Sequence, residues 1–375
     1  MIRFSSTIRQ IQETAGKVSL AIPAKTIDPR YDTIHLMLDN GKLTFFATDG
    51  ELAITAACEV DSTDNGNIGI KARTLQDFLR SMYDTPVTFA IDRQEISDHG
   101  TVTISTDKGR YKVPCLFESR AEKREKKYDI TIELKTDELR DMIQRTVFAC
   151  SVDGMRPAMM GVLFELEENC LTGVSTDGHR LVRYRKSIAA SFAEKQKIVV
   201  PARVLSIVQR LAENDTVTMS IDQERRSVRY LFGDVVLEAA LIVEPYPNYE
   251  AVIPVEHDKK LVAERTVIYD SVKRVGRFSS MGDIRIEIDG EMLRIMAENT
   301  NEGESAQEEL HCRYNGEPIV IGFNAKFIEA ALAHIDNDEV DIELKSPTTA
   351  VIFRPVTQKE GEDLIILVMP VRINN

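Results

Sequence analysis

The residues best suited to catalysis lie in one short segment, Thr176-Asp177-Gly178-His179-Arg180. The segment offers a carboxylate, an imidazole and a guanidinium, which could serve as acid, base and anion clamp. A second segment, Thr48-Asp49-Gly50-Glu51, begins in the same way but has neither the histidine nor the arginine. Because Asp-Gly favours tight turns, the shared pattern predicts turn geometry, and the added His179-Arg180-Leu181 predicts a local binding feature. A hydrolytic enzyme that uses Asp177, His179 and Arg180 remains an alternative.

Other catalytic and metal-binding motifs do not occur. The chain has no Gly-x-x-x-x-Gly-Lys-[Ser/Thr] loop, no Gly-x-Ser-x-Gly elbow and no His-Glu-x-x-His pair. Its six histidines are scattered without ligand spacing. Five cysteines, at positions 58, 115, 150, 170 and 312, include no Cys-x-x-Cys pair and are predicted to be buried free thiols. The sequence therefore predicts no catalytic residue, no metal site and no cofactor.

Length and composition indicate a globular protein of several domains. A chain of 375 residues exceeds what one hydrophobic core usually organises, so two or three domains are expected. The longest apolar run, 364–371, is too short to span a membrane, and the first residues contain no signal-peptide core. We therefore expect no membrane partner and a cytoplasmic location. The net charge of −13 argues against nucleic acid as a partner unless the charge is unevenly distributed.

Three short patterns recur in the same order along the chain. The first is a strand end with a turn, the second a helix, and the third a strand with a proline near its end. They begin at Leu43, Leu171 and Leu293, at Ala72, Ala202 and Ala325, and at Val113, Glu244 and Met369. One spacing of about 125 residues fits all three patterns. The sequence predicts three copies of one domain, at 1–126, 127–254 and 255–375, each with two amphipathic helices on antiparallel sheet, an α+β fold.

The predicted helices and the rest of the chain differ in charge. Helices are expected at 7–18, 71–82, 135–149, 201–213, 260–278 and 324–335. They hold 16 basic and 9 acidic residues, a sum of +7, which leaves −20 for the remainder. If all helices face one way, that face attracts phosphate without reading sequence. Candidate contacts on the helices are Arg73, Arg80, Arg140, Arg145 and Arg203; ordinary solvated helix faces are the alternative.

Four motifs carry a resemblance to a known family. They are Ser175-Thr-Asp-Gly-His-Arg-Leu181, Pro247-Asn-Tyr249 with Val252-Ile-Pro254, Gly322-Phe-Asn-Ala325, and Val368-Met-Pro-Val-Arg372. In their order and spacing, the chain resembles the bacterial DNA polymerase III beta subunit, the sliding clamp family. The resemblance covers the whole chain and is weakest in the first third.

The resemblance implies a non-catalytic homodimer whose six domains close a ring around double-stranded DNA, without sequence preference. It implies Lys25 as a further DNA contact, and a contact between subunits that joins Tyr111 and Val113 to Val275 and Phe278. It also implies a hydrophobic cleft for short peptides of the polymerase catalytic subunit, the clamp loader and other replication and repair proteins. By position the cleft would use Met159, Thr176, Gly178, His179, Arg180, Leu181, Pro247, Val252, Asn324, Phe327, Leu367, Met369, Pro370, Val371 and Arg372.

A ring threaded by DNA cannot leave sideways unless an interface opens. Weak phosphate contacts then suffice to align it, and a docked polymerase shares its residence on DNA. A repeat scaffold that binds proteins and never encircles DNA is the second alternative.

Overall fold

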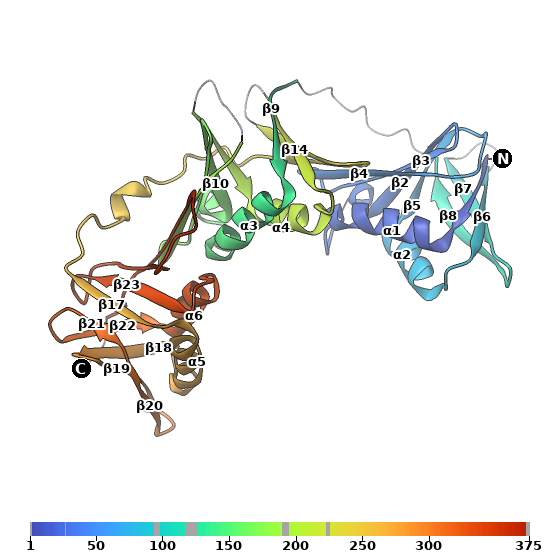
Figure 1. Cartoon of the computed structure of the whole chain (residues 1–375). Coiled ribbons are helices and arrows are strands. Elements are labelled where there is room, and N and C mark those ends of the chain that lie inside the picture. The colour runs from blue at the N-terminus through green and yellow to red at the C-terminus, as the bar shows by residue number, and fades with distance from the viewer. Residues whose placement is uncertain are drawn as a thin grey trace. The chain divides into compact units, whose positions relative to one another are not determined.

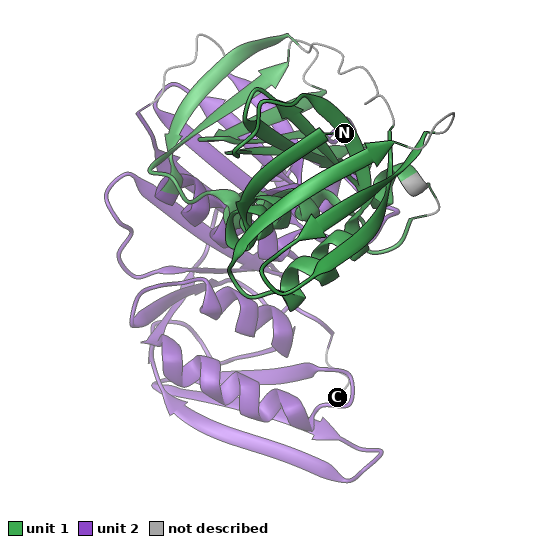
Figure 2. Cartoon of the chain, turned by 90° about the vertical axis from the view of Figure 1, so that its right-hand side faces the viewer, with its two compact units in different colours: residues 1–136, 207–241 green, residues 137–206, 242–375 purple. Residues whose placement is uncertain are grey.

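The computed structural model describes residues 2–26, 28–93, 98–117, 127–189, 195–222 and 226–372. The predicted join after residue 126 borders residues outside these ranges. The chain forms two compact units, residues 1–136 with 207–241 and residues 137–206 with 242–375 (Figure 2). The second predicted domain therefore contributes segments to both units.

Unit 1 contains one antiparallel sheet of twelve strands (Figure 1). In sheet order these are β1 (Ile2–Thr7), β6 (Pro86–Arg93), β7 (His99–Ser105), β8 (Arg110–Leu116), β5 (Gly66–Lys71), β2 (Thr33–Asp39), β3 (Lys42–Thr48), β4 (Leu52–Glu59), β16 (Val235–Ala240), β15 (Ser227–Phe232), β14 (Thr216–Asp222) and β9 (Tyr128–Lys135). Helices α1 (Ile8–Val18) and α2 (Ala72–Ser81) pack against each other, and α1 also packs on β3 and β4. Pairing of β4 with β16 carries the sheet from the first predicted domain into the second.

Unit 2 contains a sheet of nine strands and a sheet of four, both antiparallel. The larger has the order β13 (Gln196–Pro201), β10 (Gly161–Glu167), β11 (Cys170–Thr176), β12 (Arg180–Ser187), β25 (Glu362–Val368), β24 (Val351–Pro355), β23 (Glu339–Leu344), β17 (Lys259–Glu264) and β21 (Arg313–Tyr314). The smaller has the order β20 (Glu304–His311), β19 (Met292–Asn299), β18 (Asp283–Asp289) and β22 (Ile319–Asn324). Pairing of β12 with β25 joins the second predicted domain to the third.

The described residues contain four more α-helices. Helix α3 (Thr136–Thr146) enters unit 2 at Asp137, α4 (Ala202–Leu211) crosses the division between the units, and α5 (Arg265–Val275) packs against α6 (Ala325–Ala333). Short 3-10 turns follow the first helix of each copy: η1 (Ser19–Ala21), η3 (Val147–Ala149) and η6 (Gly276–Phe278).

The local sequence explains these elements. Helix α1 begins where the Thr7 hydroxyl accepts a hydrogen bond from the Gln10 amide at 3.3 Å, and it buries an apolar stripe that includes Ile11 and Val18. Strands β2 and β3 alternate buried residues with partly accessible ones over most of their length, as a half-buried strand should. Their turn places Asn40 and Gly41 at positive φ, which these two residue types adopt most readily.

One backbone hydrogen bond recurs in all three copies. The first residue of α1, Ile8, donates its amide to Thr85 at 3.0 Å; Thr136 of α3 donates to Asp215 at 2.9 Å, and Arg265 of α5 to Asp338 at 2.7 Å. Each acceptor follows the second helix of its copy by the same interval, thirteen residues after Ala72, Ala202 or Ala325. The three-fold repeat predicted from the sequence is therefore a repeat of structure, which gives positions on the shared helices and strands of one copy counterparts in the others.

The predicted helices agree with the structure to within a few residues, except at the start of the fifth. Residues 260–264 were predicted to open the fifth helix but form most of strand β17. Leu261 and Ala263 are buried while Lys260 and Glu264 are exposed, which is the two-residue period of a strand. With the observed bounds, the helices exclude four of the basic residues counted above, Lys71, Lys135, Lys260 and Arg277. They also exclude two of the acidic ones, Glu213 and Glu264. The six helices then carry +5, so the predicted excess is present but smaller.

Candidate functional site

The segment Thr176–Arg180 is a tight turn, as its counterpart in the first copy indicates. Asp177 Oδ1 accepts hydrogen bonds from the amides of His179 and Arg180 at 2.9 and 3.0 Å, and Gly178 has φ +90°. Asp49 Oδ1 likewise accepts from the two amides that follow Gly50, which has φ +97°. The prediction of turn geometry is confirmed, because the Asp177 carboxylate is engaged by backbone amides in the manner of a copy that lacks the histidine.

The residues added in the second copy build an aromatic and cationic stack. The Arg180 guanidinium lies 5.5 Å from the Phe148 ring centre and 5.1 Å from that of Phe327, and its Nε donates to Asp177 Oδ2 at 3.0 Å. His179 stacks on Phe327 at 5.9 Å, and Phe148 stacks on His334 at 3.7 Å. Arginine over two ring faces gains cation–π attraction. The stack joins β12 to α6 and to the turn after it.

The end of the chain is fastened beside this turn. Leu181 pairs with Leu367 across β12 and β25, and the Met369 amide donates to the His179 carbonyl at 2.8 Å. The Val371 amide donates to the Gly322 carbonyl at 2.9 Å. Pro370, which has no amide hydrogen, stands between these two bonds, so its missing donor costs no pairing there.

The predicted cleft residues divide into a buried base and an exposed set. Leu181 and Leu367 are each 2% exposed and belong to a core cluster with Leu163, Val174, Val199, Tyr249 and Ala350. Tyr246 and Ile253 pack against the same cluster and flank Pro247 and Val252. Val252 is 52% and Met369 37% exposed. Apolar groups of this kind over a packed base suit a short peptide with leucine and phenylalanine anchors.

Other predicted cleft residues have local structural roles. Asn324 is the N-cap of α6, its Oδ1 accepting from the Lys326 amide at 3.1 Å. Thr176 Oγ1 donates to the Arg180 carbonyl at 2.7 Å, and the Met159 carbonyl accepts from the Ser151 amide at 2.9 Å. Sequence reasoning missed Phe148 and His334. Phe148 and Leu20 lie the same number of residues after the first residues of α3 and α1. The repeat therefore aligns Phe148 with Leu20, and this correspondence was a signal that the sequence offered.

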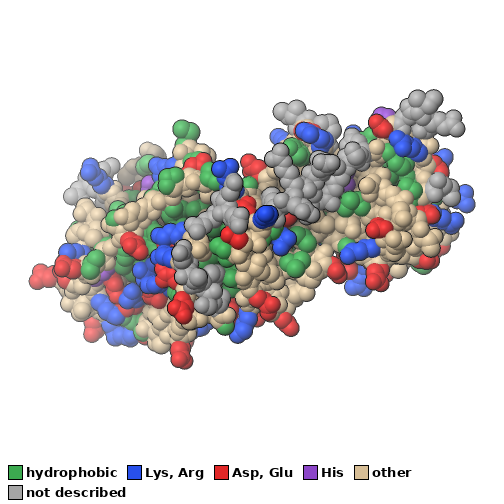
Figure 3. All heavy atoms as spheres, turned by 90° about the horizontal axis from the view of Figure 1, so that it is seen from above, with side chains coloured by type: hydrophobic (Ala, Val, Ile, Leu, Met, Phe, Trp, Pro, Cys, Tyr) green, Lys and Arg blue, Asp and Glu red, His purple; other side chains and the backbone are tan. Residues whose placement is uncertain are grey.

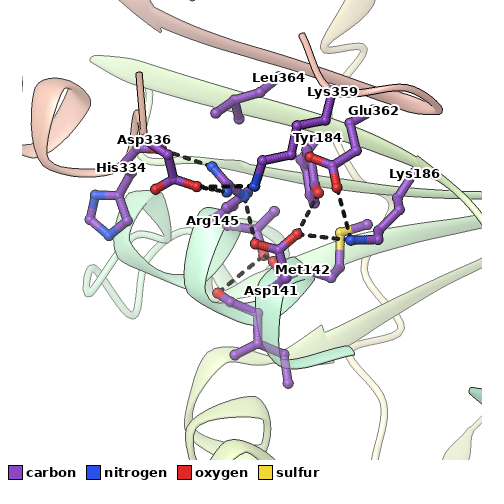
Figure 4. A network of polar contacts seen from close by, with 12 residues as sticks. Asp141, Met142, Arg145, Tyr184, Lys186, His334, Asp336, Lys359, Glu362 and Leu364 are labelled. Atoms are coloured by element: carbon purple, nitrogen blue, oxygen red, sulfur yellow. Dashed lines mark hydrogen bonds and ion pairs between the residues drawn. The ribbon is translucent and has the colours of Figure 1, made fainter. Parts of the chain in front are cut away.

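Arg145 is the centre of a polar network within unit 2 (Figure 4). Its side chain is 9% exposed, and its Nε donates to Asp141 Oδ1 at 2.7 Å. Other guanidinium nitrogens donate to Asp336 and, at 3.2 Å, to the His334 carbonyl. The structure does not support Arg145 as a DNA contact, because its charge is buried and its donors are engaged.

Asp141 is the second hub of the network. Its Oδ2 accepts from Lys186 Nζ at 3.1 Å and from the Tyr184 hydroxyl, and Lys186 also pairs with Glu362 at 3.0 Å. Burial raises the pKa of Asp141. The hydrogen bond from Tyr184 and the charge of Arg145 lower it by more than burial raises it, so the pKa lies below its ordinary value. The network fastens α3 and β12 to the turn after α6 and to β25.

The other predicted DNA contacts are more accessible. Lys25, Arg73, Arg80 and Arg203 are exposed, and Arg140 is half-buried. Figure 3 shows basic and acidic side chains interspersed over one face of the molecule, with small apolar areas between them.

Of the four residues predicted to join subunits, two are exposed and two are buried. Tyr111 is 38% and Phe278 40% exposed, whereas Val113 is 6% and Val275 1% exposed. Tyr111 packs edge-on against Phe78 of α2, with ring centres 5.1 Å apart. Direct contact by Val113 and Val275 is not supported, because both side chains are buried in their own units.

The five cysteines form no disulfide bond. All five cysteines are free; Cys115, Cys150 and Cys312 are buried as predicted, but Cys58 and Cys170 are partly exposed. Burial raises the pKa of the Cys115 thiol to about 11, which keeps it protonated.

Among the described residues, no helix has the length and apolar character needed to cross a membrane.

Comparison with known proteins gives matches along the whole chain. Family models of the DNA polymerase III beta subunit match residues 2–118 as its N-terminal domain, 133–248 as its central domain and 250–372 as its C-terminal domain. The beta sliding clamp of Pseudomonas putida KT2440 is 25% identical over 379 residues, 99% of each chain. That of Treponema pallidum is 31% identical over 249 residues, 65% of this chain and 66% of the relative.

Solved structures agree in fold. The DNA polymerase III subunit beta of Pseudomonas aeruginosa has a TM-score of 0.90 at 22% identity, covering 99% of this chain and all of that one. A sliding clamp of the same organism bound to griselimycin gives 0.91 at 23%, with the same coverage. The predicted α+β fold of three repeated clamp domains is confirmed. Because the three domain models match in order along almost its full length, the chain belongs to the DNA polymerase III beta subunit family, the beta sliding clamps.

Proposed function

We propose that two copies of the chain close head to tail into a ring that encircles duplex DNA and holds the replicative polymerase on its template. As a beta sliding clamp, the chain is a non-catalytic processivity factor of DNA replication. The proposal concerns how this chain closes, what it encloses and where its partners dock.

One observation carries the proposal: both domain junctions inside the chain use the same strand pairing in the same register. In β4 and β16, Ile54 lies opposite Leu237; in β12 and β25, Val182 lies opposite Ile366. Ile54 and Val182 occupy one repeat position, because they lie opposite Ala47 and Ser175 in the preceding strands. Five residues after Leu237 lies Ile242, and five residues after Ile366 lies Val371. These two residues make equivalent backbone bridges, Ile242 to Val199 and Val371 to Gly322.

The third pair of strands of this kind would be β20 and β8, which do not pair with each other within the described chain. In the part of the chain that the structure describes, β20 pairs only with β19, and β8 pairs with β7 but meets β5 only at Leu116. An exposed strand edge is a template for another chain. Pairing of β20 with β8 of a second copy would repeat the internal junctions, and two such heterologous contacts would close a ring.

The repeat register also sets the residues that would meet. Ala306 lies opposite Ala297 and is the counterpart of Ile54 and Val182, while Tyr111 precedes Leu116 by five residues. Ala306 of one subunit would therefore face Tyr111 of the other. Exposed Arg110 and Lys112 on β8 and exposed Glu304 and Glu309 on β20 have complementary charge. This pairing supports Tyr111 as a dimer contact.

Contacts to DNA are proposed for the exposed basic residues Lys25, Arg73, Arg80 and Arg203, with half-buried Arg140. Single charges on helices attract phosphate without reading bases, which is what a sliding ring requires. Tight base contacts would stall movement.

Partner docking is proposed for the surface formed by the Thr176–Leu181 turn, Phe327 and Leu367–Arg372, with Met159, Pro247, Val252 and Asn324 at its margin. Its partners would be the polymerase catalytic subunit, the clamp loader and other replication and repair proteins, each through a short peptide. The Arg180 stack supports this assignment, because it fixes an exposed histidine and a half-buried phenyl ring beside the exposed Met369. Preorganised apolar groups bind peptides at a lower entropic cost.

The test loads the protein onto nicked circular DNA with a clamp loader and ATP, washes at high salt, and then linearises the DNA. Retention on circles and loss from linear DNA is expected of a topological ring. Loss from circles during the salt wash would overturn the proposal. A mass measurement separates the scaffold alternative, since a stable monomer at working concentration cannot form a six-domain ring.

A further inference from the structure

A cation recurs at one position in the first helix of every copy. Lys17, Arg145 and Arg274 each lie nine residues after the first residue of α1, α3 and α5. The recurrent amide bonds of Ile8, Thr136 and Arg265 show that these helix starts are equivalent. The three cations are therefore counterparts in structure, although their surroundings differ.

At both internal junctions this cation meets an acid of the next copy. Lys17 Nζ lies 3.7 Å from Glu213 Oε2, and Arg145 pairs with Asp336. Glu213 and Asp336 also share one repeat position, eleven residues after the first residue of α4 and of α6. The same ion pair has thus been built twice, once in each compact unit.

Apolar or aromatic side chains lie beside each ion pair. Phe148, three residues after Arg145, stacks on His334 at 3.7 Å. Leu20, three residues after Lys17, lines one hollow together with Leu211, the counterpart of His334. Lys17 and Glu213 line the same hollow. Each internal junction therefore has a cation–acid pair beside apolar or aromatic side chains from the same repeat positions.

The third junction would bring α5 of one subunit to α2 of the other. The position that holds Glu213 and Asp336 holds Tyr83 in the first copy, and the position of Leu211 and His334 holds Ser81. On α5 and η6 the counterparts are Arg274 and Arg277. Here two arginines would meet a phenol and a hydroxyl, so both the acid and the apolar partner are replaced.

We infer that Arg274 lies against Tyr83 of the partner subunit, and that this junction lacks the ion pair present at both internal junctions. The inference rests on the proposed head-to-tail dimer. In the single chain both side chains are accessible: Tyr83 is 46% exposed, and the Arg274 side chain is 58% exposed. Each is held by a carboxylate of its own chain, with the Tyr83 hydroxyl 2.7 Å from Asp107 and Arg274 2.7 Å from Glu308.

The consequence is a ring with one kind of weak junction. A phenol attracts a guanidinium through its ring face or hydroxyl, but it carries no charge of its own, so Arg274 keeps Glu308 of its own chain as its ion-pair partner at this position. The internal junctions are also joined by the continuous chain, so the ring separates at the contact between subunits. Tyr83 makes that contact weaker than a third copy of the ion pair would, which favours opening there.

The test installs the missing acid. In the full-length chain, Tyr83→Glu is expected to tighten the dimer, and Tyr83→Gln, of similar size but uncharged, is not. Dimer dissociation constants are measured by sedimentation or by mass photometry over a dilution series. A closed ring has two such junctions, so the expected gain is roughly two- to thirtyfold, the range for two exposed ion pairs.

A double-mutant cycle assigns the gain to Arg274. Tyr83→Glu in an Arg274→Met background is expected to lose its advantage, whereas the advantage should survive Lys273→Met on the neighbouring exposed cation. The cycle also removes any cost of placing the new carboxylate beside Asp107, because that cost is common to both backgrounds. Coupling that is zero, or equal for positions 273 and 274, overturns the inference while the dimer stands. A wild-type chain that is monomeric throughout overturns the proposed function as well.

Discussion

The Arg180 guanidinium lies 5.1 Å from the centre of the Phe327 ring and so joins strand β12 to helix α6 within unit 2. The contact brings the turn that carries His179 to the helix whose N-cap is Asn324. Both sides of the proposed peptide surface are thereby fixed before any peptide arrives.

Phe327→Ala is expected to weaken binding of a short peptide with leucine and phenylalanine anchors by about tenfold or more, the range for an aromatic hot spot. The variant removes the apolar surface and frees Arg180 from one face of its stack. Fluorescence anisotropy of a labelled peptide measures the change. Tyr269→Ala, which removes a half-buried ring elsewhere in unit 2, serves as the control. Equal losses in both variants would contradict the assignment.

Arg145→Met is expected to lower the free energy of unfolding by about 2–3 kcal/mol, because Asp141 would keep its burial and lose its main cation. Urea titration followed by circular dichroism measures the change. The exposed pair of Arg9 with Glu13, at 73% and 61% side-chain exposure, provides the comparison. Arg9→Met should cost much less, because an exposed ion pair contributes little to stability. A cost for Arg145→Met no larger than this would show that the network does not stabilise unit 2.

Stability is expected to fall as the pH is lowered from about 7 to 5. Burial lowers the pKa of His334, and the charges of Arg180 and Arg145 lower it further. The unfolded chain takes up the proton near pH 6.5 while the folded chain resists it, so the stabilisation is present above that pH and is lost below it. His334→Phe, which can keep the stack on Phe148, should reduce the difference between melting temperatures at pH 7.5 and 5.5. The exposed His311→Gln serves as the comparison, and an equal effect of both substitutions would refute the assignment.

Tyr111→Asp is expected to weaken the dimer at least about tenfold, since a desolvated carboxylate would replace an apolar contact at two junctions. Sedimentation equilibrium over a dilution series measures dissociation. Val356→Asp alters a side chain of similar exposure, 42% against 38%, away from strands β8 and β20. The proposed register fails if the two variants dissociate alike.

Arg73→Gln with Arg80→Gln is expected to weaken binding to a duplex and to flatten its dependence on salt by up to about two phosphate contacts. The slope of log affinity against log salt is the measured quantity. Arg285→Gln with Arg294→Gln removes the same charge from strands, where the side chains are 39% and 38% exposed. A slope reduced as much by the strand pair would exclude a special role for the helices.

Much of the fold could be predicted because the repeat makes each copy evidence for the others. The turn at Gly178 was predicted correctly because Asp49 and Gly50 show the same pattern without the extra residues. The start of the fifth helix was missed because Lys260 and Glu264 suit a helix surface as well as a strand edge. Pairing with β23 and β21 decides between them, and both pairings join residues far apart in the sequence.

The candidate site was predictable in its members but not in their exposure. Arg145 and Arg140 have the same residue type on one helix, and no local pattern shows that only Arg145 meets Asp336. Likewise Val113 and Tyr111 differ by two positions and so share a strand face, yet one is buried and the other accessible. Such differences depend on which distant segment covers each side chain.

The pairing of β4 with β16 has a practical consequence for dissecting the molecule. A fragment that stops before the second third of the chain would leave β4 with one side unsatisfied, and a fragment that begins after it would expose β25 in the same way. Unsatisfied strand sides recruit other chains, so excised thirds should precipitate or assemble into unnatural oligomers. Cuts meant to yield well-behaved pieces must therefore respect the sheets rather than the sequence repeat.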